Sequence, residues 1–62
     1  MIIVIVIKER SERSGTIEEV VSHGIDMDTN EIITLPSVSP QNLGAIFDMS
    51  IGEYVLKDKN DF

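Results

Sequence analysis

The sequence predicts one small α+β domain over residues 1–62, in which a mostly antiparallel sheet (order β-β-β-α-β) carries one helix on one face. Two observations support this prediction. The chain opens with a run of β-branched residues at 2–7 that is typical of a buried strand. Ser39 and Pro40 form the clearest helix start, because serine caps helix N-termini and proline favours the first helical position.

The first strand, 1–8, is apolar at every position through residue 7, so both of its faces need cover. One helix can cover only one of them. The chain has no cysteine for a disulfide, and a domain of this size is marginally stable by itself. We therefore expect a homodimer that completes the fold. The expected interface residues are Ile3, Val4, Ile5, Val6 and Ile7.

Residues 9–15 are polar, end in a glycine and are predicted to be a loop. Residues 16–24 allow two interpretations. Thr16 and Glu19 fit the capping box of a short helix that ends at Gly24. The alternation of apolar residues instead fits a strand paired back onto 1–8. The strand is preferred, because the helix would have only about two turns.

Residues 25–35 are predicted to form a hairpin, whose turn places Asn30 in the left-handed conformation. Its second strand, 32–35, ends at Pro36. Asp26, Asp28 and Asn30 have the spacing that opens a calcium-binding loop, but a glutamate stands where that loop needs glycine. We expect a turn and no metal site.

The helix after Ser39 is predicted to use Leu43, Ile46 and Phe47 as its apolar stripe. Gly44 would then lie inside the helix and mark close packing against the sheet. Gly52 interrupts the helical pattern, residues 54–56 are predicted to form a last short strand, and the tail 57–62 is expected to fray.

His23 is the only histidine, and a serine precedes it. Adjacent residues of a strand point to opposite faces, which argues against a serine–histidine–aspartate triad at this place. We expect His23 to be structural, and we expect neither enzymatic activity nor a cofactor.

Three segments, 28–36, 41–45 and 52–56, together resemble the swapped-hairpin core of AbrB-type and MazE-type regulators. In that family a turn precedes a strand that ends in proline, then come a short helix ending in Leu-Gly and another strand. The resemblance implies a transcriptional regulator or antitoxin. The family reads DNA with basic residues near the helix, whereas residues 14–56 contain no lysine or arginine. Any DNA contact would then come from Lys8, Arg10 and Arg13.

Charge is the strongest signal distributed along the chain. There are 11 acidic and 5 basic residues, for a net charge of −6. This acidity argues against a phosphate-binding surface. It allows two interpretations: the preferred one is a surface that keeps a small hydrophobic protein soluble, and the other is a negative face that matches a protein partner with a basic surface, such as the nucleic-acid groove of an enzyme. The carboxylates expected to bind that partner are Glu18, Glu19, Asp26, Asp28 and Glu31.

We therefore expect a non-enzymatic binding protein that inhibits or regulates a partner protein. Small acidic inhibitors that phages and mobile elements direct against host nucleic-acid-handling or defence enzymes are of this kind. Direct binding to nucleic acid is not expected. The run 2–7 is too short for a membrane span, which needs about 20 apolar residues, and it lacks the features of a signal peptide. We expect the protein in the cytoplasm and not on a membrane.

Overall fold

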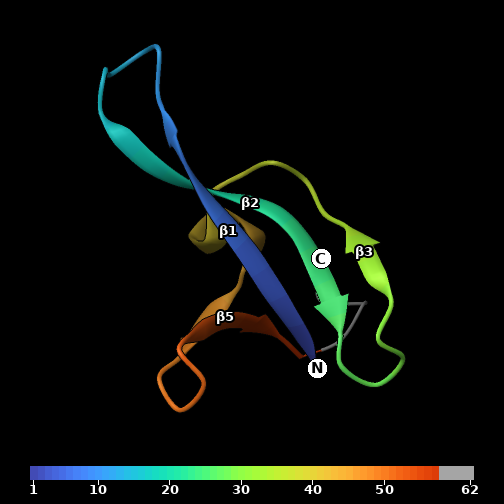
Figure 1. Ribbon diagram of the computed structural model, residues 1–62. Coiled ribbons are helices and arrows are strands. Elements are labelled where there is room, and N and C mark those ends of the chain that lie inside the picture. The colour runs from blue at the N-terminus through green and yellow to red at the C-terminus, as the bar shows by residue number, and fades with distance from the viewer. Residues whose placement is uncertain (58–62) are drawn as a thin grey trace.

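The structure, a computed structural model that describes residues 1–57, is one antiparallel sheet with one short helix (Figure 1). The elements in chain order are β1 (Ile2–Arg10), β2 (Ile17–Asp26), β3 (Ile32–Thr34), α1 (Pro40–Leu43), β4 (Ile46–Asp48) and β5 (Glu53–Leu56). The strands lie in the order β3-β2-β1-β5-β4. The predicted antiparallel sheet with a helix is confirmed, with one strand more than predicted. The tail predicted to fray is 57–62; its first residue, Lys57, follows β5 directly, and residues 58–62 lie outside the described residues.

Strand β1 is the centre of this sheet, with a paired neighbour on each side. It pairs with β2 along its whole length and with β5 over its first three positions. The preferred interpretation of residues 16–24 as a strand is therefore confirmed. Because β1 continues to Arg10, the connection to β2 begins later than the predicted loop 9–15.

A bulge at Ser22 divides the long β1–β2 hairpin into two parts. Ile5 pairs with His23 but Val6 pairs with Val21, so Ser22 is the extra residue. The Val21 amide donates to the Val38 carbonyl at 2.8 Å, which ties β2 to the segment before α1. Beyond the bulge, residues 7–19 continue as a mostly exposed two-stranded ribbon that projects from the body of the sheet (Figure 1). We call this ribbon the arm.

The core lies between the sheet and the segment that carries α1. Its buried apolar side chains are Ile2, Val4, Val21, Leu35, Leu43 and Leu56. Gly24 makes the close approach of these layers possible. A Cβ atom at this position would lie 2.8 Å from Ile2 Cγ2 and 2.9 Å from Leu35 Cδ1. Because both distances are shorter than van der Waals contact, Leu35 can pack over β2 only where no side chain is present.

Helix α1 begins as predicted and ends earlier. The Ser39 hydroxyl accepts a hydrogen bond from the Asn42 amide at 3.2 Å, and Pro40 takes the first helical position. Gly44 then adopts a left-handed conformation with a φ of 86°, which terminates the helix. The predicted stripe was therefore wrong: Ile46 and Phe47 belong to β4. The predicted close packing of Gly44 was wrong as well, since nothing lies within 4 Å of a Cβ built there.

Replacing Gly24 with alanine is expected to lower the free energy of unfolding by about 1–3 kcal/mol, the usual cost of overpacking a core. The physical reason is the overlap of the new methyl group with Ile2 and Leu35. Chemical denaturation of the two proteins measures the difference.

The control for this prediction is a second substitution that removes one of the two side chains crowding position 24. In a Leu35→Ala background, the added methyl group meets one crowding neighbour fewer, so Gly24→Ala should cost less than in the wild-type chain. Equal costs in the two backgrounds would contradict the packing argument.

Candidate functional site

Aliphatic side chains cross the outer face of the sheet, which is the face turned away from α1, from one edge to the other. The strand registers place five of them in one row, each directly opposite the next: Ile32, Ile25, Ile3, Val55 and Ile46. The residues at the two ends of the row are strongly exposed, 75% for Ile32 and 66% for Ile46. The three residues between them are partly exposed. The row is therefore an open apolar surface.

Two further rows complete what we call the outer face. The second holds Thr34, His23 and Ile5, and the third holds Val20 and Ile7. These positions, like those of the first row, carry no acidic or basic side chain apart from His23. The expected interface residues of β1 divide accordingly. Ile3, Ile5 and Ile7 lie on the outer face, whereas Val4 is fully buried in the core and Val6 packs against it.

His23 is half-buried on the outer face, opposite Ile5. The bulge brings the Ser22 hydroxyl within 3.0 Å of its Nδ1, although neighbouring residues of a regular strand point apart. Asp26 lies on the other side of the sheet, where its register partner is the core residue Ile2. The serine and the histidine are thus brought together and this aspartate is not, so the three do not form a triad.

The β4–β5 hairpin, residues 46–56, presents a second surface of different composition. Its large exposed apolar side chains are Ile46, which also ends the first row of the outer face, and Phe47, Met49 and Ile51. Met49 is the most exposed of them at 87%. The Phe47 ring packs edge-on against Tyr54, with ring centroids 5.2 Å apart. The amide of Gln41 in α1 donates to the Tyr54 hydroxyl at 3.4 Å. A hollow of about 800 Å³ beside this hairpin is lined by Met1, Gly44, Ile46, Phe47, Asp48, Met49, Val55, Leu56 and Lys57.

Asp48 shapes the turn of this hairpin and carries a negative charge on it. Its carboxylate accepts hydrogen bonds from both the hydroxyl and the amide of Ser50. Its carbonyl accepts a further bond from the amide of Gly52 at 2.8 Å, a residue whose φ of 72° closes the turn. The Ser50 hydroxyl and then the Ser50 amide lower the pKa of Asp48 below its ordinary value of 3.8. The carboxylate is thereby held in its charged form beside Phe47 and Met49.

The five carboxylates expected to bind a partner do not form one surface. Glu18 and Glu19 lie on the arm, and the other three lie at the opposite end of β2. Asp26 is buried, and its carboxylate accepts from the Asp28 amide at 2.9 Å, so it shapes the turn between β2 and β3. Asp28, 3.6 Å from the N-terminal amine, and Glu31 are exposed and remain available. The left-handed conformation predicted for Asn30 is confirmed, with a φ of 60°.

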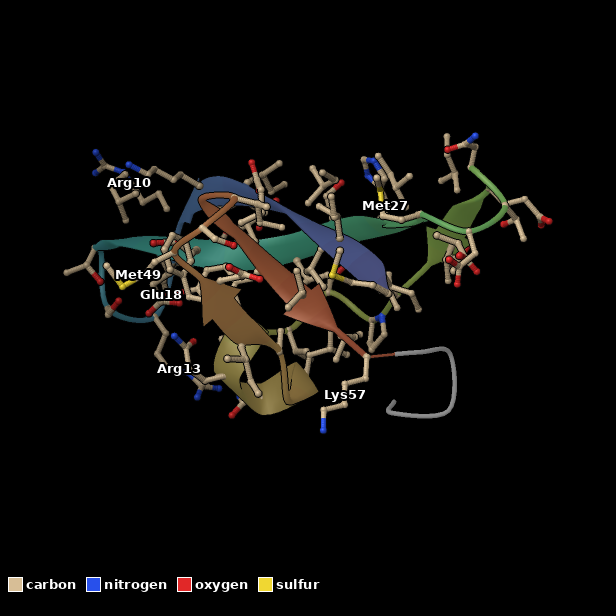
Figure 2. All side chains as sticks on the ribbon, turned by 90° about the horizontal axis from the view of Figure 1, so that it is seen from below. Arg10, Arg13, Glu18, Met27, Met49 and Lys57 are labelled. Atoms are coloured by element: carbon tan, nitrogen blue, oxygen red, sulfur yellow. The ribbon has the colours of Figure 1, made fainter. Side chains whose placement is uncertain are left out.

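Three of the basic residues, Lys8, Arg10 and Arg13, lie on the arm. Acidic residues alternate with them there, and Lys8 pairs across the ladder with Glu19. In Figure 2, Arg10 and Met27 lie on the side of the sheet away from α1, whereas Arg13 and Lys57 lie on the side of α1. The arginines of the arm thus point in different directions and do not form one basic patch.

Residues 1–57 hold no group of three or more histidine, cysteine, aspartate or glutamate side chains positioned for a metal ion. Within the same part of the chain, no helix has the length and apolar character to cross a membrane. Comparison of the chain with known protein families, with characterised proteins and with solved structures finds no match.

We expect Ser50→Ala to destabilise the protein at neutral pH. A carboxylate with a depressed folded-state pKa stabilises the fold above its ordinary pKa, and this stabilisation is lost as the pH falls through the folded-state value. Since the Ser50 hydroxyl is the largest cause of the depression at Asp48, the stability difference between wild type and variant should shrink below pH 3.8. Urea denaturation over a pH series measures it.

The same comparison in an Asp48→Asn background is the control. Without the carboxylate at position 48, the effect of Ser50→Ala should no longer depend on pH. If the effect of Ser50→Ala still depended on pH in this background, the stabilisation by Ser50 would not arise from its hydrogen bonds to the charged Asp48 carboxylate.

Proposed function

We propose that the protein acts by binding, without catalysis, to a partner protein that it inhibits or regulates, and that the β4–β5 hairpin makes the contact. The observation that carries this proposal is the combination of Phe47, Met49 and Ile51 with the charged Asp48 on one exposed hairpin. Aromatic residues and methionine are enriched at protein–protein interfaces. Side chains of this size, left exposed together, mark interaction sites rather than ordinary surface.

The charge of the hairpin indicates the chemistry of the partner. Asp48 and Glu53 pair across the β4–β5 ladder, so two carboxylates lie at the turn end of the hairpin. Like charges opposite each other destabilise a ladder slightly, and a cationic partner would relieve this repulsion. We therefore propose a partner with an apolar pocket bordered by lysine or arginine. Asp28 and Glu31 would speed its approach from a distance, because peripheral charges act mainly on the association rate. The proposed site of action is the cytoplasm.

A second candidate function has one observation in its favour. The arm projects from the body and carries Lys8, Arg10 and Arg13, and two-stranded ribbons can enter the major groove of DNA. This candidate is the transcriptional regulator or antitoxin implied by the resemblance to AbrB-type and MazE-type proteins. The arm also carries Glu9, Glu12, Glu18 and Glu19, one carboxylate more than it has cations. A ribbon with net negative charge repels phosphates, so the protein partner is preferred.

Substitution of the hairpin should weaken partner binding by about tenfold or more, the scale of a central apolar contact of about 1.4 kcal/mol. The test variant is Phe47→Ala with Met49→Ala, immobilised beside the wild-type chain and exposed to a lysate of the cells in which the chain acts. A protein retained in stoichiometric amount by the wild type is then titrated against both. Glu53→Gln should reduce the salt dependence of the same interaction.

The matched control is Ile17→Ala, which removes an isoleucine that is 60% exposed on the arm, far from the hairpin. It should leave affinity unchanged. Equal affinity of all variants would refute the hairpin as the contact. A DNA mobility shift at low salt that is lost in Arg10→Ala with Arg13→Ala would favour the regulator instead.

A further inference from the structure

We propose that the outer face of the sheet is covered by a second copy of the chain, so that the protein is a reversible homodimer built as a two-sheet sandwich. This inference concerns a different face from the proposed partner contact, although Ile46 and Val55 of the β4–β5 hairpin belong to the outer face, so the two contacts adjoin at this edge of the sheet. It rests on three properties of the outer face: its extent, its composition, and its relation to the small core beneath it.

The extent of the outer face follows from sheet geometry. Ten residues form it, and each covers an area set by the strand spacing of about 4.8 Å and a two-residue repeat of about 6.8 Å. The face therefore measures about 300 Å² in plan, and its accessible area is larger because side chains stand out from it. The largest apolar patch on a typical monomer covers about 300–600 Å² and is often a functional surface. The same extent is below that of a permanent dimer, which favours a weak and reversible association.

Composition selects a second copy over a different protein. Eight of the ten residues are isoleucine or valine, and none is phenylalanine, tyrosine, tryptophan, methionine or arginine. Met1 and Met27, joined by a backbone hydrogen bond, border the first row, and Met27 lies on this side of the sheet. Interfaces with separate partners are enriched in aromatic residues, methionine and arginine, as the β4–β5 hairpin is in the first two. Interfaces between identical subunits resemble a domain core cut in half, and an isoleucine- and valine-rich sheet face fits that description. Two identical sheets also share the same twist, which lets their faces pack aligned.

Charge permits this association despite the acidity of the chain. The carboxylates nearest to the outer face lie around it: Glu9 and Glu18 beyond the third row, Asp28 and Glu31 at the β2–β3 turn, and Asp48 and Glu53 at the β4–β5 turn. Two neutral faces can therefore meet while the carboxylates of both copies stay in water at the rim. A strongly charged partner would find no complementary group on this face.

The small core gives the second copy a stabilising role. Within residues 1–57, the core holds six buried aliphatic side chains and the buried Pro40, and the chain has no cysteine. Domains of this size commonly depend on disulfides, metals or oligomerisation for their stability. Dimerisation would bury the outer-face side chains of β1 and its neighbours between the two sheets. The strand β1, which already supplies Ile2 and Val4 to the core, would then be buried on both faces.

Sedimentation equilibrium of the purified chain over roughly a hundredfold concentration range through the micromolar region tests the proposal. The expected mass rises from 6.9 kDa toward twice that value. Ile7→Glu with Ile32→Glu, both on the outer face and both exposed enough to spare the core, should weaken the dimer at least about tenfold. Ile51→Glu with Ile17→Glu is the matched control, since Ile51 is exposed to 44% and Ile7 to 43%. The control pair adds the same charge outside the ten residues of the outer face and should leave the dimer intact.

A single cysteine gives a second readout that does not depend on destabilising the dimer. The chain has no thiol of its own, so His23→Cys places one thiol at the middle of the outer face. Near a two-fold axis this residue faces its own counterpart, and a short bismaleimide should cross-link it. Glu12→Cys, at the tip of the arm, should not cross-link. A mass that stays at 6.9 kDa throughout, or a dimer broken by the control pair and not by Ile7→Glu with Ile32→Glu, would overturn the proposal.

Discussion

The missing side chain of Gly24 is the constraint on which the rest of the fold depends. It lets Leu35 lie directly over β2 and against Ile2, so the chain can leave β3, cross the inner face and place α1 beneath the sheet. Because Leu35 is held in this position, the Val38 carbonyl can accept a hydrogen bond from the Val21 amide next to the bulge. Ser39 then lies where its hydroxyl caps the helix. A larger residue at position 24 would overlap Ile2 and Leu35, so these side chains would have to move.

The two faces of the sheet then acquire different roles through simple alternation. Even positions at the start of β1 enter the core, and odd positions form the outer face. Because β5 and β4 continue the same registers, Tyr54 and Phe47 follow the core side while Val55 and Ile46 follow the outer side. Two kinds of surface result: a neutral aliphatic face that suits an identical sheet, and a mixed aromatic and acidic hairpin that suits a different protein.

Sequence reasoning predicted the features that depend on a few neighbouring residues. The cap at Ser39, the turn at Asn30 and the β2 strand are all local patterns, and all three are present. It failed where two local patterns compete: Leu43, Ile46 and Phe47 have helical spacing, but the left-handed Gly44 ends the helix among them. The row of five aliphatic residues could not be predicted either, because it requires the pairing of segments from both halves of the chain.

The pairing of β1 with β5 also determines when the protein can fold. Ile2 lies in register with Leu56. The second edge of β1 can therefore form its hydrogen bonds only after β5, at the end of the described residues, is available. The hairpins β1–β2, β2–β3 and β4–β5 are local and can form early, whereas joining the two halves closes a long loop and is slow. On the ribosome, the nascent chain therefore presents an open edge of β1 and a half-built core until β5 has been synthesised. Aggregation and proteolysis would act on it in that interval.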